Sequence, residues 1–308
     1  MAIPLILWGA AAALGATGVV KGAKAVSTMN DAKDLGERAE RRHRRKLNEL
    51  NESRDETNNK FEELGKLKLD IFSEQIYHIV QVLKQQKDAG STLVGFDSKF
   101  STDELKQMET MAIQSIELER GLLSGAAGGA LAGLGAYGSV GFLATASTGT
   151  AISTLSGAAA TNATLAWLGG GSLAAGGFGM TGGMIALGGI VAGPALAIGG
   201  FMLASKAEEA LTKAYQYSAE VDEAVEKMDL IEEGLMGLRE NANEVIYALN
   251  ELRKRFESVK VDLYTDPGCQ QMLTIGKAMK TLLDYKIMAD DGSPALNIKQ
   301  VCSGYLKY

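Results

Sequence analysis

An apolar or small residue recurs every three or four positions along residues 207–259 of this 308-residue chain. The two spacings alternate, apart from one 3–3 step at Val225, Met228 and Ile231, and this heptad pattern is typical of a long coiled-coil helix. At a rise of about 1.5 Å per residue, a helix over Ala207–Val259 would be about 80 Å long. We predict that this segment is one continuous helix.

Residues 31–87 carry a second, less regular apolar stripe. The stripe is well formed from Phe61 to Leu83, whereas Asn51–Lys60 supplies almost no apolar residue. We expect this segment to be a helix and the antiparallel partner of the one at 207–259. Their contact should be more hydrated around residues 51–60.

Two further helices are expected at recognisable start signals. Ser101 and Glu104 have the spacing of a capping box, and Asp266 with Pro267 forms a typical N-cap and first-turn pair. Because alternating β-branched runs are scarce, the predicted fold class is all-α: an elongated bundle of long antiparallel coiled-coil helices with a Gly/Ala-rich hydrophobic helical hairpin. The expected segments are an apolar N-terminal helix (1–26), long amphipathic helices (27–120), an uncharged Gly-rich membrane-insertion hairpin (121–205), a long heptad helix (206–260), and a C-terminal helix and strap (261–308).

Charged residues are confined to two parts of the chain. Residues 1–20 and 121–205 contain no Asp, Glu, Lys, Arg or His. Residues 21–120 carry 18 basic and 19 acidic side chains, and residues 206–308 carry 13 and 18. No region has the sustained excess of Lys and Arg that phosphate neutralisation requires, so nucleic acid is not an expected partner.

The uncharged N-terminus admits three interpretations. Ala23, Lys24 and Ala25 have the A-x-A form of a signal-peptide cleavage site, although no basic residue precedes the apolar run. The segment also has about the 20 residues needed to cross a bilayer, with Lys21 and Lys24 then on the cytoplasmic side. Alternatively, it packs into a protein core through its glycines.

The block at 121–205 is 85 residues long and contains 23 glycines. As helix it would suffice for about two to four passes of the ~30 Å hydrocarbon core of a bilayer. Glycine weakens a helix unless closely approaching backbones compensate, and a glycine at every fourth position provides such a packing face in lipid. The residues expected to serve membrane insertion and helix packing are Gly121, Gly125, Gly129, Gly133, Trp8 and Trp167.

Hydroxyl side chains gather near one helical face of the same block. They are Ser147, Thr150, Thr154, Thr161 and Thr164. These groups are candidates for a pore lining, because uncharged hydroxyls form a wettable wall without a buried charge. The alternative is that they bond neighbouring carbonyls or bridge helices.

A basic ridge is formed by four arginines at helical spacing, Arg38, Arg41, Arg42 and Arg45. The ridge is a candidate contact for anionic lipid head groups, to which each basic residue near the surface contributes about 1 kcal/mol. The alternative is a solvated face, because the segment also holds i,i+4 pairs of opposite charge such as Glu37 with Arg41.

The sequence lacks the patterns of catalytic and cofactor sites. The GxG at 169–171 has neither a strand before it nor an acidic residue about 20 positions on, and no Gly-Lys-Ser or Gly-Lys-Thr occurs, so nucleotide binding is not expected. Cys269 and Cys302 lie outside metal-ligand spacing and are expected to be reduced. His43 and His78 have no nearby acid or thiol that would make them catalytic, and are expected to be surface or packing residues. We predict a protein that is not an enzyme and holds no cofactor or metal.

The order of the segments resembles a known architecture. Over residues 1–260, an apolar N-terminus, a long charged helix, an uncharged hairpin and a heptad helix are similar to the α-helical pore-forming toxins of the cytolysin A type. The hydropathy layout is also similar to apolipoprotein L and to the hydrophobic translocators of type III secretion. Ala144–Gly177 (ATASTGTAISTLSGAAATNATLAWLGGGSLAAGG) and the later GGIVAGPALAIGGFMLASKAEEAL resemble uncharacterised bacterial glycine-zipper proteins, which bring no known activity.

The toxin resemblance implies a soluble form that holds the hairpin against its helices and then releases it to insert and oligomerise around a pore. The uncharged block is longer than a single hairpin needs, which leaves the number of inserted helices open. We therefore expect a membrane-permeabilising toxin or defence effector, whose partners are a lipid bilayer, further copies of itself and a protein that controls insertion. Its soluble form is expected in the bacterial cytoplasm, with secretion as the alternative. The competing hypothesis is a non-enzymatic, membrane-anchored coiled-coil scaffold.

Overall fold

The computed structural model describes residues 19–88, 100–122, 128–138, 207–259, 266–289 and 292–307. These residues are mostly helical and include no β-strand, which confirms the all-α prediction. Extended pairing among them is limited to an isolated antiparallel bridge between Met288 and Pro294. None of the helices in these ranges is both long enough and apolar enough to span a membrane.

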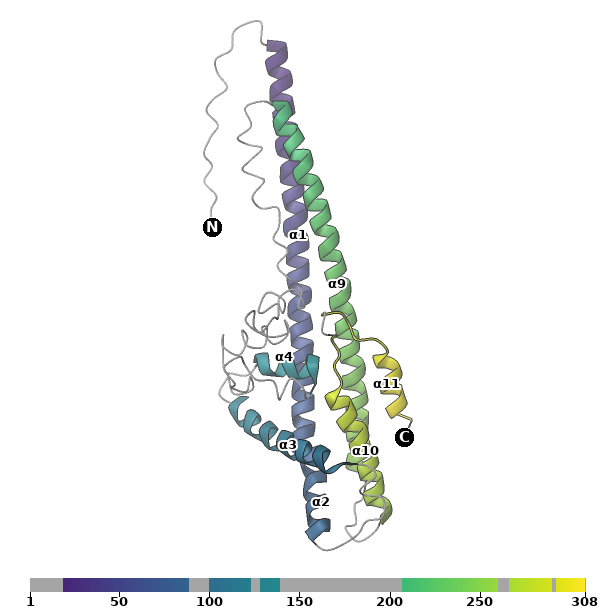
Figure 1. Ribbon diagram of the computed structural model, residues 1–308. Helices are drawn as coiled ribbons and strands as arrows, with labels where there is room; N and C mark the ends of the chain where they lie inside the picture. Colours follow the sequence, from purple (N-terminus) through teal and green to yellow (C-terminus); the bar gives the residue numbers. More distant parts are fainter. Residues whose placement is uncertain are drawn as a thin grey trace. The chain divides into compact units, whose positions relative to one another are not determined.

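The N-terminal helix is continuous over three elements, α1 (Val19–Ile71), η1 (Phe72–Ile76) and α2 (Tyr77–Asp88) (Figure 1). The helix predicted over residues 31–87 is therefore confirmed. Apolar spacing did not indicate that η1 is a π-helical turn, in which Phe72, Gln75 and Ile76 are buried. Such single π turns are rare and break the regular i→i−4 pattern of hydrogen bonds.

Helix α9 (Ala207–Ser258) confirms the long helix predicted from the heptad pattern. Its apolar stripe is buried along much of its length, because the 3–4 spacing keeps these side chains on one face. The buried stripe residues in its second half are Leu235, Leu238, Ala242, Val245, Leu249 and Leu252.

Four shorter helices complete the described chain: α3 (Thr102–Leu122), α4 (Gly128–Tyr137), α10 (Asp266–Asp284) and α11 (Ile298–Tyr305). The capping box predicted at the start of α3 is confirmed. The backbone N–H of Ser101 donates to Glu104 Oε2 at 2.8 Å, and the N–H of Glu104 donates to Ser101 Oγ at 3.2 Å. The expected C-terminal strap contains the helix α11.

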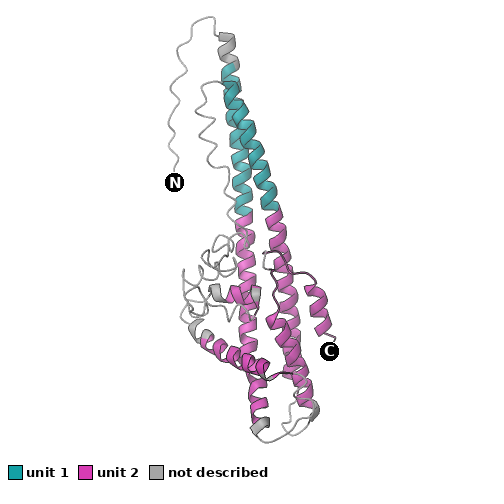
Figure 2. Ribbon diagram, viewed as in Figure 1, with its two compact units in different colours: residues 1–49, 191–229 teal, residues 50–190, 230–308 magenta. Residues whose placement is uncertain are grey.

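The chain divides into two compact units (Figure 2). Unit 1 comprises residues 1–49 and 191–229, and unit 2 comprises residues 50–190 and 230–308. Helices α1 and α9 each contribute their first part to unit 1 and their remainder to unit 2.

In unit 1, α1 and α9 pack through small apolar residues and run parallel. Ala32 of α1 packs with Ala210 and Ala214 of α9, and Ala39 packs with Tyr217 and Val221. Residue numbers therefore rise together along the two helices. The ion pair of Lys46 with Asp229, at 2.5 Å, continues the same order.

The predicted antiparallel arrangement is therefore wrong. A heptad stripe specifies which face of a helix is buried, but it carries no direction. A short loop would force two successive helices to run antiparallel. Here residues 72–206 lie between α1 and the start of α9, so the connection imposes no such constraint.

Unit 2 contains the larger apolar core. Here η1 and α2 pack against α3 and α10. The largest fully buried apolar side chains of this core are Phe61, Phe72, Leu50, Leu64, Leu69, Ile71, Ile76, Ile79, Met108 and Leu134.

A polar layer in unit 2 fills the part of α1 that has no apolar stripe. Arg239 of α9 donates from Nη1 to Ser53 Oγ at 2.8 Å and to Thr57 Oγ1 at 2.9 Å, and both hydroxyl residues are buried. The same nitrogen bonds the carbonyl oxygen of Ser53 at 2.9 Å. One long cationic side chain thus bonds both of the buried hydroxyl side chains in the segment 51–60.

Candidate functional site around helix α4

Helix α4 is the part of the uncharged block that the structure places inside a core. Its sequence, GGALAGLGAY, has no charged side chain and no polar face. From Leu131 to Ala136, all residues are buried except Ala132, which is half-buried. The helix packs in unit 2, against α1 and the chain that follows α10.

Two glycines bring the backbones of α1 and α4 into direct contact. A Cβ atom at Gly65 of α1 would lie 2.6 Å from the carbonyl carbon of Leu131 and closer still to its oxygen. A Cβ atom at Gly135 of α4 would lie 2.8 Å from the carbonyl carbon of Phe61. The crossing is reciprocal, because each glycine faces the residue four positions before the other. A side chain at either position would overlap the backbone of the other helix, so only glycine fits at both.

Lys68 is fully buried beside this crossing, one turn after Gly65. Its ammonium donates to the carbonyl oxygen of Gly135 at 3.4 Å and to that of Tyr285 at 3.3 Å. Burial lowers the pKa of Lys68 to about 7, and the nearby Asp284 carboxylate opposes this shift in part. A lysine that changes its charge near neutral pH therefore contacts the first helix of the uncharged block.

The C-terminal end of α4 is held by the chain after α10. Gly138 has φ of 64°, and its N–H closes the helix by donating to the carbonyl oxygen of Leu134 at 3.0 Å. A Cβ at Gly138 would lie 2.7 Å from the carbonyl group of Asp284. The N–H of Ile287 donates to the carbonyl oxygen of Ala136 at 3.0 Å. Backbone groups thus provide most of this attachment.

The predicted packing glycines are only partly described. Gly121 lies near the end of α3, and Gly129 and Gly133 lie in α4, where Gly133 is buried. The close approach of backbones occurs at Gly135, which the predicted set did not include. The remaining predicted residues lie outside the described part of the chain: Gly125, Trp8, Trp167, Ser147, Thr150, Thr154, Thr161 and Thr164.

The basic ridge is divided between two environments. Arg42 faces α9, where it donates to Ser218 Oγ at 3.0 Å and pairs with Asp222 at 2.8 Å. Arg41 is exposed and pairs with Glu37 at 3.3 Å, as expected for an i,i+4 pair. Arg38 and Arg45 are also exposed. A contact with anionic groups would therefore involve Arg38, Arg41 and Arg45 rather than all four arginines.

The start of α3, which leads into the uncharged block, is attached to α10. Lys277 pairs with Glu104 at 2.5 Å, and its ammonium lies 5.1 Å from the centre of the Phe100 ring. The hydrogen bond from Lys277 is the largest cause of the fall in the pKa of Glu104 to about 2, and the bonds from Ser101 add to it. Glu104 therefore connects the capping box with α10.

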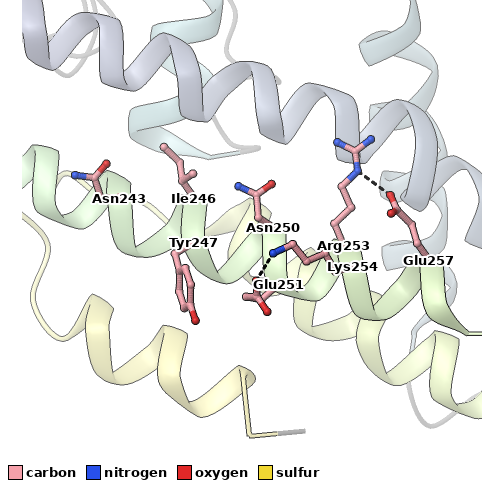
Figure 3. A pocket seen from close by; sticks show the side chains of 8 residues that line it. All are labelled: Asn243, Ile246, Tyr247, Asn250, Glu251, Arg253, Lys254 and Glu257. Atoms are coloured by element: carbon pink, nitrogen blue, oxygen red, sulfur yellow. Dashed lines mark hydrogen bonds and ion pairs between the residues drawn. The ribbon is translucent and has the colours of Figure 1, made fainter.

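An open hollow of about 590 Å³ lies along the surface of α9 in unit 2 (Figure 3). Its lining includes Ile246, Tyr247 and Arg253, and Figure 3 shows Tyr247 on the opposite side of the helix from the other two. Its charges are already paired, since Arg253 bonds Glu257 at 3.1 Å and also pairs with Glu74 of η1. The lining groups therefore do not converge on a ligand.

The cysteines and histidines do not form a chemical centre. Neither Cys269 nor Cys302 forms a disulfide, and both are buried, as expected for reduced cysteines. Burial raises the pKa of the Cys302 thiol to about 11, which disfavours the reactive thiolate. His78 packs edge-on against Phe256 with ring centres 6.2 Å apart. Across the described ranges, His, Cys, Asp and Glu side chains form no cluster that could hold a metal ion.

Comparisons of the chain with known protein families, with curated proteins and with solved structures give no match. What the site around α4 can do is therefore argued from its own groups. They are glycines, backbone carbonyls and one buried amine, and they hold an apolar helix against α1.

Proposed function

We propose that this chain is an α-helical membrane-permeabilising protein, a toxin or defence effector, which inserts its uncharged block into a bilayer. The observation that carries the proposal is the docking of α4. This chargeless helix opens the block and is stored in the core of unit 2 against α1. A protein that must remain in water before insertion needs such a storage site, because exposed apolar helices aggregate.

The chemistry of the docking site supports release. The described bonds to α4 come from backbone groups and from the amine of Lys68, and its sequence has no side chain that could form an ion pair. Undocking therefore breaks van der Waals packing and hydrogen bonds to carbonyls, without separating an ion pair. Close packing of glycine backbones is also the interaction that stabilises helix pairs in lipid, so the same surface can serve in both environments.

The parallel course of α1 and α9 in unit 1 gives further support. The described helices α1 and α9 both begin at the same end of the pair, at Val19 and Ala207. In the sequence, residues 1–18 precede the first of these helix starts and the block at 121–205 precedes the second. Both of these chain segments are uncharged over long stretches. We propose that the pair is a parallel coiled coil that delivers both apolar segments to one membrane, where copies of the chain assemble. Arg38, Arg41 and Arg45 would meet the anionic head groups.

The second candidate is a membrane-anchored coiled-coil scaffold that is not an enzyme. The tightness of the crossing at Gly65 and Gly135 favours it, since backbone contact at both glycines is typical of permanent packing. In that case α4 would remain docked, and the rest of the uncharged block would act as an anchor.

Leakage of a trapped dye from liposomes separates the two functions. Purified full-length chain is added to neutral phosphatidylcholine vesicles and to vesicles that also contain anionic phosphatidylglycerol. The proposal expects dye release that increases with the anionic fraction. Protein that binds the vesicles but releases no dye at any composition contradicts the proposal and supports the scaffold.

Substitutions in the block test the assigned faces. Thr150→Lys places a charge on the proposed pore lining, and Gly129→Leu fills the proposed packing face, so both should abolish leakage while helical content is unchanged. Gly304→Leu is the matched control, because no described atom lies within 4 Å of a Cβ at Gly304. Leakage that is equal in all three variants would refute the assignment of these faces.

A further inference from the structure

We propose that Lys68 is a proton-linked latch, which controls the release of α4 from its docking site on α1. The inference rests on the proposed function, because it assigns a regulatory residue to the step that begins insertion. Its subject is a lysine that is fully buried in unit 2 and contacts α4 directly.

The geometry makes the state of Lys68 depend on α4. Its ammonium lies between the carbonyl oxygens of Gly135 and Tyr285, at 3.4 and 3.3 Å. One of its two described hydrogen-bond partners thus belongs to α4. When α4 leaves, water reaches the amine in its place. Undocking therefore changes the environment of Lys68 from a desolvated core to a hydrated surface.

Within the described ranges, the charged group that acts on Lys68 comes from α10. Asp284, at the end of α10, is the carboxylate that acts on it, and Asp284 also pairs with Lys280. Helix α4 contributes only backbone carbonyls, because its sequence contains no titratable group other than Tyr137. Desolvation is the larger cause of the lowered pKa of Lys68, and the attraction by Asp284 opposes it in part.

Linkage determines the direction of the effect. The docked lysine has a pKa of about 7, while a hydrated lysine has the ordinary value of 10.5. Between these values the undocked form binds more protons, so undocking takes up a proton and becomes easier as the pH falls. Below pH 7 both forms are protonated and the effect levels off. The opening equilibrium should increase about fifty-fold between pH 9 and pH 7.

Hydrogen exchange of the full chain without lipid measures this opening. Protection of the α4 amides, corrected at each pH for the intrinsic exchange rate, is followed at pH 7, 8 and 9. Wild-type protection should fall about fifty-fold from pH 9 to pH 7. Amides of α10 serve as the internal reference, and their protection should change much less.

Two variants assign the effect to Lys68. Lys68→Met keeps most of the apolar stem and removes the amine, and should make α4 protection independent of pH. Lys66→Met is the matched control, because Lys66 is exposed two residues away on α1, and it should keep the wild-type slope. A flat wild-type profile overturns the latch, as does an unchanged slope in Lys68→Met. If Lys68→Met fails to fold, the wild-type slope in α4 relative to α10 still decides.

The outcomes distinguish the latch from the proposed function. Leakage from liposomes together with pH-independent α4 protection would overturn the latch and leave the proposed function in place. Protection of the α4 amides that depends on pH, in a protein that releases no dye from any vesicle, would support the latch and contradict the proposed function.

Discussion

Replacing Gly65 by alanine tests whether the α1–α4 crossing controls release. The added Cβ would lie 2.6 Å from the carbonyl carbon of Leu131, whereas ordinary van der Waals contact begins at 3.4 Å. The helices must therefore move apart by about 0.8 Å or more, and the obstacle is backbone, which cannot rotate away as a side chain could. Overpacking of this kind typically destabilises a core by about 1–3 kcal/mol.

Replacing glycine by alanine also raises helix propensity, which stabilises the protein and has to be separated from the cost of overpacking. Alanine stabilises a helix interior by about 1 kcal/mol relative to glycine, so the net cost of Gly65→Ala should be up to about 2 kcal/mol. Gly234→Ala in α9 is the matched control, since no described atom lies within 4 Å of its added Cβ. This control should stabilise the protein by up to about 1 kcal/mol.

Urea unfolding and hydrogen exchange of α4 measure the two effects. We expect Gly65→Ala to lower the protection of the α4 amides and to accelerate dye release from liposomes, and we expect Gly234→Ala to do neither. A Gly65→Ala protein as stable as the Gly234→Ala protein, with α4 equally protected, would refute the argument that backbone contact holds this helix.

Three further predictions concern the remaining polar contacts. Arg239→Met should lower the free energy of unfolding by about 2 kcal/mol in urea titrations, because the buried hydroxyls of Ser53 and Thr57 lose a charged donor. Adding Ser53→Ala and Thr57→Val should recover most of this loss, and the absence of any recovery would contradict the polar-layer argument. The pKa of Glu104 falls from 4.5 to about 2 on folding, so its stabilising contribution is present above pH 4.5 and is lost as the pH falls to 2. The difference in unfolding free energy between wild type and Glu104→Gln should therefore shrink over that pH range, and a constant difference would argue against the contact with Lys277. Arg38→Gln with Arg45→Gln should weaken binding to phosphatidylglycerol vesicles by about 2 kcal/mol, roughly thirtyfold, in sedimentation assays, whereas the exposed control Lys227→Gln should leave binding unchanged.

The helices could be predicted from the sequence, but their direction could not. The heptad pattern of α9 and the capping box at Ser101 and Glu104 are local signals, and local signals determine where a helix begins and which face it buries. The direction of α1 relative to α9 depends on the path of residues 72–206, which contain most of the uncharged block. Composition gives no information about that path.

The docking site was missed because its residues look ordinary in isolation. Gly65 is a lone glycine in an amphipathic helix, which by itself indicates only a lower helix propensity. Lys68 resembles a surface lysine in the run KLKLD. A usable signal was present, however. Lys68 lies four residues after Leu64 and four before Phe72, both of which are buried, so it occupies a position on the apolar stripe itself. A lysine at such a position predicts a buried amine with a specific partner.

The π-helical turn η1 has a consequence for the helix beyond it. A π turn accommodates one residue more than an α turn, so α2 is rotated by about 100° from the orientation that an uninterrupted α-helix would give it. That rotation brings Ile79 against Gly276 of α10 and His78 against Phe256 of α9. The phase of α2 thus depends on a single inserted residue, and a one-residue deletion within 72–76 would turn its apolar side away from neighbours whose own sequences had not changed.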